Sequence, residues 1–214
     1  MKKSMILGLA LGVALSGFAA NTVTSVWDSG MLKEAVVAPE GVRAVTDKTL
    51  LFSGQRVLRM DSACLPEKLA AFSVTVWVKP ESFVQYNEIF RIDASEGRVL
   101  LSFQEKGKIL SLGLDVNGTY QECDARINPE SVLDGGWHFA AATFDGKEHR
   151  VYLDGALIGQ VPHTGVAKVA RVPGFVGSAG GHGEFFQGGL DDLRLYTTTL
   201  SPEEVTAASK TGAA

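Results

Sequence analysis

The sequence predicts an all-β fold made of antiparallel strands. Apolar and polar residues alternate in several short runs, and this period of two marks strands with one buried face. The dipeptides Asn117-Gly118 and Asp154-Gly155 separate such runs, and both residue types tolerate the positive φ that a tight hairpin turn requires. The one helix start that we identify lies near the C-terminal end. These observations together favour a β-sheet scaffold.

The N-terminal segment resembles a secretory signal peptide. Met1-Lys2-Lys3 is basic, an apolar run extends to Leu15, and the small residues Gly17 and Ala19 precede a cleavage site after Ala19. The alternative, a membrane anchor, is weak because the run is too short to span a bilayer comfortably. We therefore predict a signal peptide over residues 1–19 and a single domain over 20–214, exported to the periplasm, the cell surface or the medium.

The mature chain is mildly acidic. Loss of residues 1–19 lowers Lys+Arg from 20 to 18 against 24 Asp+Glu, so the net charge becomes −6. A surface of this sign without a basic stripe argues against nucleic acid and anionic membranes as partners. We expect no membrane insertion after signal cleavage.

The first clear strand covers Phe72 to Val78, where every second residue is apolar, and Pro80 ends it because proline cannot donate to the ladder. A strand with Val99 to Phe103 follows, then a turn around Lys106-Gly107. Asn117-Gly118 closes the next hairpin into Thr119–Arg126. The residues predicted to face the core in this region are Val99, Leu101, Phe103, Leu110, Leu112, Leu114 and Val116.

Two cysteines remain in the mature chain, Cys64 and Cys123. If the Asn117-Gly118 turn has two residues, Cys123 lies opposite Leu112 on the core face. In an exported chain the pair can form a disulfide, worth roughly 4 kcal/mol in the chain-entropy model. The alternative is two separate buried thiols.

The segment Trp137–Gln160 predicts a further hairpin, with a turn at Asp145-Gly146 and a second turn at Asp154-Gly155. Residues 163–189 are rich in glycine and are expected to carry one short strand around Phe175–Gly177. The last strand is predicted over Leu190–Tyr196. A helix over Pro202–Ser209 should follow, because Ser201 and Glu204 form a capping box around Pro202 at the first helical position.

Three blocks in this order resemble the laminin-G-like domains of the concanavalin A-like lectin and glucanase superfamily: Phe72–Pro80, Trp137–Gln160 and Phe186–Tyr196. The resemblance extends over about Phe52–Val205. It implies a jelly-roll sandwich of two antiparallel sheets. It implies less about function, because this fold carries enzymes, lectins and adhesion modules.

The resemblance does not extend to a glucanase site. Glucanases of this superfamily carry alternating acids on one strand, Glu-x-Asp-x-Glu or close to it, and we find no such match. Glu88 and Asp93 are five positions apart and should lie on opposite strand faces, and Asp191 and Asp192 diverge. Zinc and serine-hydrolase motifs are also missing, and the histidines lack metal-ligand spacing. We therefore predict a non-catalytic protein, with a divergent glycoside hydrolase or lyase as a less favoured alternative. The four histidines are His138, His149, His163 and His182, and His138 is expected to have a structural, hydrogen-bonding role.

Asp191 is the candidate for a calcium site. It shares the parity of Leu193 and Leu195, so its carboxylate should point partly inward unless a bulge resets the register. A buried carboxylate needs backbone donors or a cation, and laminin-G-like domains often bind calcium near this position. Asp28 would add a second acid if its strand lies beside the last one. Against this, Ser53 replaces the aspartate of the family's Phe-Asp-Gly block.

Trp77 and Tyr152 point away from the predicted core and are candidates for an aromatic platform that binds sugar rings, with Arg150 as a charged donor. The alternative is that loops or the N-terminal segment cover these rings. The rim loops offer further polar candidates, namely Tyr86, Asn87, Asp124, Arg126 and His182.

The sequence thus favours an exported recognition module that binds a glycan or a glycosylated partner. The second hypothesis is a structural module that docks to another protein of the cell envelope.

Overall fold

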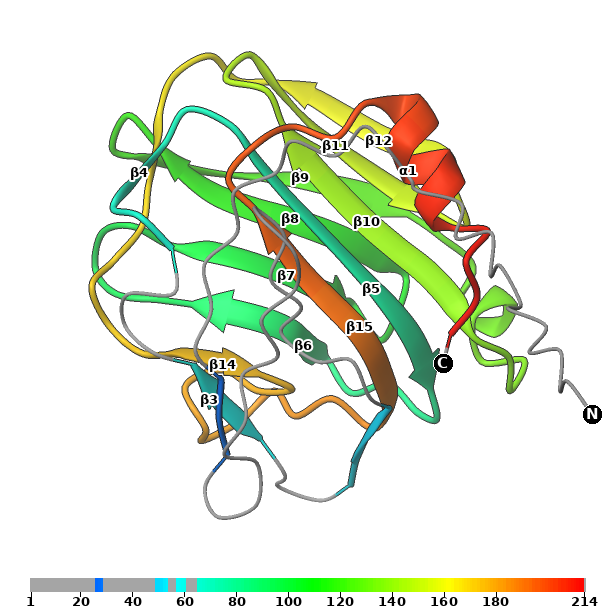
Figure 1. Ribbon diagram of the computed structural model, residues 1–214. Helices are drawn as coiled ribbons and strands as arrows, with labels where there is room; N and C mark the ends of the chain where they lie inside the picture. Colours follow the sequence, from blue (N-terminus) through cyan, green and yellow to red (C-terminus); the bar gives the residue numbers. More distant parts are fainter. Residues whose placement is uncertain (1–25, 29–48, 54–56, 61–64, 214) are drawn as a thin grey trace, which may run out of the picture.

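The computed structural model describes residues 49–53, 57–60 and 65–213, and the backbone of residues 26–28. Two antiparallel sheets pack face to face, and a short helix follows the last strand (Figure 1). The predicted all-β sandwich is therefore confirmed. The predicted signal peptide, residues 1–19, lies outside the described residues. Within the described part of the chain, no helix is long and apolar enough to cross a membrane.

One sheet has nine strands, in the order β1-β3-β14-β6-β7-β8-β13-β4, with β9 paired to β8. Its long strands are β6 (Tyr86–Ile92), β7 (Val99–Gln104), β8 (Ile109–Val116) and β9 (Thr119–Arg126). Its short strands are β1 (Val26–Asp28), β3 (Leu58–Met60), β4 (Lys68–Leu69), β13 (Ala167–Lys168) and β14 (Gly174–Val176). The sequence predicted the strand at β14 but not the one at β13.

The other sheet has six strands, in the order β12-β11-β10-β5-β15-β2. Its strands are β2 (Leu50–Phe52), β5 (Phe72–Pro80), β10 (His138–Phe144), β11 (Glu148–Leu153), β12 (Ala156–Pro162) and β15 (Gly188–Tyr196). A single 3-10 turn, η1 (Pro129–Ser131), precedes β10.

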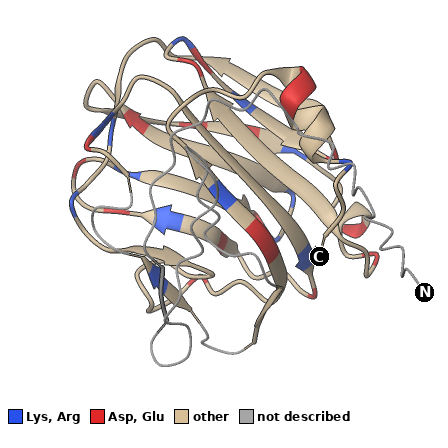
Figure 2. Ribbon diagram, in the orientation of Figure 1, with Lys and Arg blue, Asp and Glu red and all other residues tan. Residues whose placement is uncertain are grey.

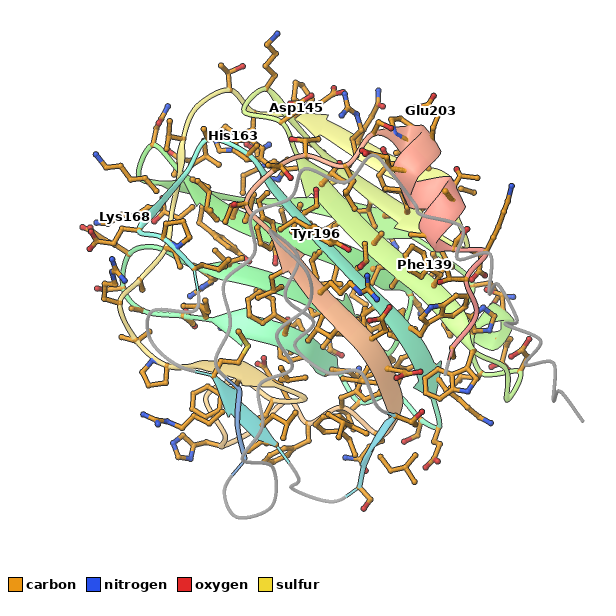
Figure 3. The ribbon with its side chains drawn as sticks, in the orientation of Figure 1. Phe139, Asp145, His163, Lys168, Tyr196 and Glu203 are labelled. Carbon is orange, nitrogen blue, oxygen red and sulfur yellow. The ribbon has the colours of Figure 1, made fainter. Side chains whose placement is uncertain are left out.

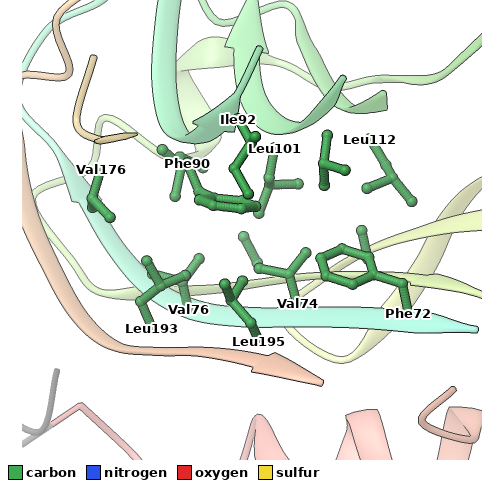
Figure 4. Close-up of a cluster of buried hydrophobic side chains, with 14 of the residues drawn as sticks. Phe72, Val74, Val76, Phe90, Ile92, Leu101, Leu112, Val176, Leu193 and Leu195 are labelled. Atoms are coloured by element: carbon green, nitrogen blue, oxygen red, sulfur yellow. The ribbon is translucent and has the colours of Figure 1, made fainter. Parts of the chain in front are cut away.

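The main core fills the space between the sheets (Figure 4). Figure 4 shows Phe90, Leu101 and Leu112 of the nine-stranded sheet facing Val74 and Val76 of the six-stranded sheet. Except for Phe90, which follows an irregularity in β6, these residues belong to alternating runs, so the period of two in the sequence places them on the inner faces.

The turns follow their predicted chemistry in most cases. Asn117 and Gly118 have φ of 53° and 77°, and Asp154 and Gly155 have 51° and 80°, as a two-residue hairpin turn of the I′ type requires. The turn after β10 covers residues 145–148 and contains the predicted Asp145-Gly146 turn, because Phe144 pairs with His149.

The C-terminal helix α1 (Pro202–Ala208) ends one residue earlier than predicted and starts as predicted. Glu204 N donates to Ser201 Oγ over 3.2 Å, and Ser201 N donates to Glu204 Oε2 over 2.8 Å, which is a complete capping box. Val205 of the helix is buried against the six-stranded sheet, so α1 covers part of that sheet's outer face (Figure 1).

A second apolar cluster lies on this outer face. Trp77 is only 8% exposed and Tyr152 only 1% exposed, and both pack under α1 and the chain around it. The predicted surface platform of these two rings is therefore wrong. The cause is coverage by other segments, the alternative that the sequence left open. The cluster consists of Trp77, Phe139, Ala141, Tyr152, Tyr196, Leu200 and Val205, of which Phe139 and Tyr196 are labelled in Figure 3.

His149 is a polar residue inside the main core. Its ring is fully buried, lies edge-on to Phe144 at 5.1 Å between centroids, and lies 5.6 Å from the ring of His163. Burial, with a smaller effect of His163, lowers the pKa of His149 to about 4. The imidazole is therefore neutral at physiological pH.

Candidate ligand-binding site

Strands β6 to β9 present a polar face on the outside of the nine-stranded sheet. Tyr86 pairs with Gln104, Gln104 with Ile109, and Ile109 with Arg126, so one residue from each strand forms a row. At about 4.8 Å per strand, the row is about 14 Å long. We define the polar face as Tyr86, Glu88, Arg91, Ser102, Gln104, Ser111, Tyr120, Glu122, Asp124 and Arg126.

A second row runs beside the first, through Glu88, Ser102, Ser111 and Asp124. Core and outer residues alternate on these strands, and most outer positions carry hydroxyl, amide or charged side chains. The exceptions are Leu100, Ile109 and Gly113. The predicted candidates Tyr86, Asp124 and Arg126 therefore share one face. Acidic and basic positions are intermixed over the strands (Figure 2).

Glu122 accepts two hydrogen bonds on this face. Gln104 Nε2 donates to Glu122 Oε1 over 2.9 Å, and the Tyr120 hydroxyl donates to the same oxygen over 2.8 Å. Ser111 Oγ donates to Asp124 Oδ1 over 2.7 Å. These bonds hold two carboxylates of β9 in fixed orientations.

Gly113 makes room for Tyr120. A Cβ atom at Gly113 would lie 2.2 Å from the Tyr120 hydroxyl, far inside contact distance, so the Tyr120 side chain crosses the sheet where a neighbouring strand has no side chain. The Arg98 guanidinium lies 4.6 Å from the centre of the Tyr120 ring, a cation–π distance. Burial, and then the hydrogen bond to Glu122, raises the pKa of the Tyr120 phenol well above its usual value.

Arg91 lies between three carboxylates at the β14 side of the face. Its Nη1 is 2.9 Å from Glu88 Oε1 and 2.9 Å from Glu184 Oε2, and its Nη2 is 2.6 Å from Asp93 Oδ2. Burial raises the pKa of Glu88 to about 8, against the opposing effect of Arg91. Glu88 is only 2% exposed, so the effect of burial on its pKa outweighs its contact with Arg91.

This cluster corrects the expectation that Glu88 and Asp93 lie on opposite faces. The register shifts between Glu88 and Phe90, so Ile89 is an extra residue in β6. A bulge of this kind reverses the parity of the residues that follow it. Both carboxylates therefore reach the same arginine.

Tyr86 is the exposed aromatic residue of the face, at 42% exposure. Asn87 fixes the segment that presents it: Val84 N donates to Asn87 Oδ1 over 2.9 Å, and Asn87 Nδ2 donates to Val84 O over 2.8 Å. Asn87 is fully buried, so the expectation that its side chain meets a ligand is wrong. It is a positioning residue because its amide is already used by the chain.

The remaining predicted candidates lie elsewhere. Arg150 lies on β11 in the six-stranded sheet, where its Nη2 is 3.2 Å from Asp145 Oδ2 and also contacts Glu148. His182 is exposed on the loop between β14 and β15. Neither joins the polar face.

His138 has the structural role that we expected. Its Nδ1 is 2.9 Å from Asp154 Oδ2, and its Nε2 is 3.1 Å from Asp134 Oδ1. Burial lowers the pKa of His138, but the bonds to the two aspartates outweigh it and raise that pKa above its usual value. The ring thus links the turn after β11 to the chain before β10.

Asp191 is fully buried, but on the outer side of its sheet. It pairs with Trp77, and the register of β15 shifts between Asp191 and Arg194, where Asp192 has φ of 47°. The bulge places Asp191 opposite to Leu193, which faces the core (Figure 4), so the inward orientation is wrong.

Asp192 N donates to Asp191 Oδ1 over 3.0 Å, so a backbone amide already serves this carboxylate, which was the alternative to calcium. The strand of Asp28 pairs with β3 of the other sheet and not with β15, so the condition for Asp28 as a second ligand fails. The described residues contain no group of three or more His, Cys, Asp or Glu side chains placed to hold a metal ion. The calcium ion itself stays a prediction.

Cys123 lies opposite Leu112 in the β8–β9 ladder and is buried, as predicted. Among the described residues it has no disulfide partner, and burial raises the pKa of its thiol to about 11. Cys64 lies outside the described residues, so the proposed disulfide between them stays a prediction.

The polar face includes an acidic pair that the sequence reasoning missed. Glu122-Cys123-Asp124 is an alternating pair of acids on one strand, and β9 places both carboxylates on the outer face. The alternation of the two acids was the available signal. At the next alternating position stands Arg126, where the glucanase pattern has a third acid.

A family model described as the concanavalin A-like lectin/glucanases superfamily matches residues 52–206, which is most of the chain. The chain belongs to this superfamily. The laminin-G-like resemblance and the jelly-roll expectation are thereby confirmed. No curated protein sequence matches this superfamily member.

Solved structures show the same fold. Domain 4 of AbnA, an extracellular arabinanase from Geobacillus stearothermophilus in complex with arabinotriose, has a TM-score of 0.58 at 19% identity, covering 87% of this chain and 88% of that chain. The binding domain of botulinum neurotoxin DC in complex with SialylT has a TM-score of 0.59 at 13% identity, covering 87% of this chain and 46% of that one.

Mouse laminin alpha1 domains LG4-5 have a TM-score of 0.58 at 14% identity, covering 74% of this chain and 46% of that chain. This chain thus spans about half the length of the toxin and laminin chains. At these identities the likeness shows the fold alone.

Proposed function

We propose that this protein is an exported, non-catalytic recognition module that binds glycans on the polar face of the nine-stranded sheet. The observation that carries the proposal is the row of Tyr86, Gln104, Ile109 and Arg126, in which an exposed aromatic ring lies on the same face of the sheet as two planar polar side chains. Export rests on the signal peptide predicted over residues 1–19.

The chemistry of this face suits a sugar chain. Sugar rings present apolar C–H surfaces that pack on an aromatic ring, and their hydroxyl groups donate to carboxylates and amides. Gln104, Glu122 and Ser111 are held by hydrogen bonds within the face, which lowers the entropy cost of binding. An arabinanase domain and a toxin binding domain of the same fold carry saccharide ligands, which supports this class of ligand.

The proposal is tested with Tyr86→Ala and a matched control, Leu51→Ala. Leu51 is also exposed and apolar but lies at the edge of the other sheet, on β2. Retention on immobilised polysaccharides and a glycan array should fall about five- to thirtyfold for Tyr86→Ala, since one stacked ring contributes about 1–2 kcal/mol. Leu51→Ala should bind as the parent does. Equal binding by both variants would remove the proposed face.

The second candidate is a structural module that docks to a protein of the cell envelope. The observation that favours it is the burial of Trp77 and Tyr152 on the outer face of the six-stranded sheet. These two rings are therefore not available to stack on a sugar. If the parent protein retains no glycan, with or without calcium, and instead co-purifies with one envelope protein, this candidate replaces the first.

A further inference from the structure

His149 and His163 form a pair of imidazole rings where β11 begins and β12 ends. The two ring centres are 5.6 Å apart. His149 lies on β11 opposite Val161 of β12, and His163 follows Val161 by two residues. Residues in this diagonal relation on neighbouring strands share a face, so the pairing of β11 with β12 brings the rings together. His163 N also donates to Lys147 O over 2.7 Å, which fixes the backbone beside the second ring.

Three ring nitrogens of this pair are buried without a hydrogen-bond partner among the described residues, namely His149 Nδ1, His149 Nε2 and His163 Nδ1. A buried polar atom normally has a partner, and an apolar side chain would fill the same volume without this cost. His163 is half-buried, and its buried Nδ1 lies on the inner side of the ring, where the fully buried His149 lies. Each neutral imidazole has one nitrogen with a free lone pair, so the pair supplies two nitrogen ligands.

The separation of the rings suits one metal ion between them. Two imidazoles that bind one ion at about 2.0–2.1 Å per nitrogen, with an angle of roughly 110–130° at the ion, have ring centres about 5–6 Å apart. The 5.6 Å between His149 and His163 lies in this range. The two side chains can therefore reach the same ion.

The surroundings favour an ion of low charge and low coordination number. Phe144 lies edge-on to His149, and Val161 lies opposite it in the ladder, so its neighbours are apolar. Burial of a charge in apolar surroundings is costly, and two neutral imidazoles compensate a monovalent ion better than a divalent one. Zinc almost always takes four ligands at a structural site. Copper is an imidazole-binding metal, and copper(I) forms stable complexes with only two nitrogen ligands.

We infer that His149 and His163 bind one copper(I) ion between their rings, with one nitrogen from each. The half-buried His163 gives the ion a path from solvent, and the buried His149 holds it from the inner side. The ion would tie the start of β11 to the chain after β12. This site belongs to the six-stranded sheet, so it is independent of the polar face and of the glycan-binding function.

The test is a titration of the protein with copper(I) in reducing, oxygen-free buffer, in competition with a chromogenic copper(I) chelator. Loss of either ring, in His149→Phe or His163→Gln, should weaken binding by more than about a hundredfold, because loss of a partner behind a metal ligand already costs about 10- to 100-fold. His149→Phe keeps the aromatic contact with Phe144, and His163→Gln changes a half-buried side chain, so both should fold. Thermal melting without metal checks this.

Two controls locate the ion. His182→Gln removes an exposed histidine and should bind copper(I) as the parent does. Cys64→Ala/Cys123→Ala removes both thiols, which are the competing copper ligands, and should keep the ion, with only nitrogen neighbours in its X-ray absorption spectrum. At about 100 times the dissociation constant, copper(I) should raise the melting midpoint of the parent by roughly 5–10 °C, and it should leave the midpoints of His149→Phe and His163→Gln unchanged.

Four results would overturn the inference. The first is a parent that binds no copper(I), and the second is binding that His149→Phe and His163→Gln both keep. The third is loss of the ion in Cys64→Ala/Cys123→Ala, or sulfur neighbours in the spectrum of the parent, because the ion would then lie at the thiols. Zinc(II) is titrated in parallel, and zinc binding at the two histidines as tight as that of copper(I) would overturn the choice of a monovalent ion.

Discussion

Replacement of His149 by phenylalanine should remove much of the acid sensitivity of this fold. The His149 ring is fully buried and has a pKa of about 4, whereas an unfolded histidine titrates near 6.5. Between these values the unfolded chain binds up to one more proton than the folded chain. The contribution of His149 to the free energy of unfolding is therefore fully present above pH 6.5 and is lost as the pH falls. The linkage relation gives a loss of about 2 kcal/mol from pH 7 to pH 5 for this residue.

The assay is urea unfolding followed by tryptophan fluorescence at pH 7 and pH 5. His149→Phe keeps the aromatic contact with Phe144, so the variant should fold, and its stability should change about 2 kcal/mol less than that of the parent over this range. His163 is the other titratable ring facing this position and stays unchanged in the comparison. The control His182→Gln replaces an exposed histidine and should follow the parent. The reasoning is refuted if His149→Phe and the parent lose equal stability.

Three further changes test other parts of the structure by the same unfolding measurement. Ser201→Ala removes the cap of α1 and should cost about 1 kcal/mol, with an unchanged midpoint contradicting the capping box. The free energy of unfolding of Glu88→Gln should rise relative to that of the parent as the pH increases from 5 to 9. The raised pKa of Glu88 in the folded state stabilises the parent below pH 4.5, and this contribution is lost as the pH rises through about 8. Parallel pH profiles of variant and parent would contradict the burial of that carboxyl. Gly113→Ala should cost about 1–3 kcal/mol and weaken glycan binding by displacing Tyr120, whereas Gly183→Ala, with open space around it, should do neither.

Local signals in the sequence were enough to predict most of the strands. Turn residues with positive φ set the register directly, so Asn117-Gly118 alone predicts that Cys123 lies opposite Leu112, and the β8–β9 ladder confirms it. The capping box likewise predicts the start of α1 at Pro202. These predictions succeeded because turn and cap depend only on residues a few positions apart.

The errors concern side-chain direction beyond a bulge and coverage of a face. The extra residues in β6 and β15 reset parity after Glu88 and Asp191, and nothing in an alternating pattern reveals such an insertion. Trp77 and Tyr152 do point away from the main core, as predicted, but parity does not tell whether a distant segment covers them. That contact depends on where α1 packs, which is a long-range property of the fold.

The acidic pair of β9, Glu122 and Asp124, has the alternating spacing of glucanase acids, and its surroundings can be compared with what hydrolysis requires. Retaining hydrolysis needs a protonated acid about 5 Å from a second carboxylate. On the polar face the carboxyl with a raised pKa is Glu88, and it lies three strands from Asp124, about 14 Å away at the backbone. Glu88 also binds Arg91 at the far end of its row, while Arg126 takes the position of a third acid. The arrangement therefore places Glu88 farther from the exposed carboxylates than retaining hydrolysis requires, which supports the glycan-binding function proposed above.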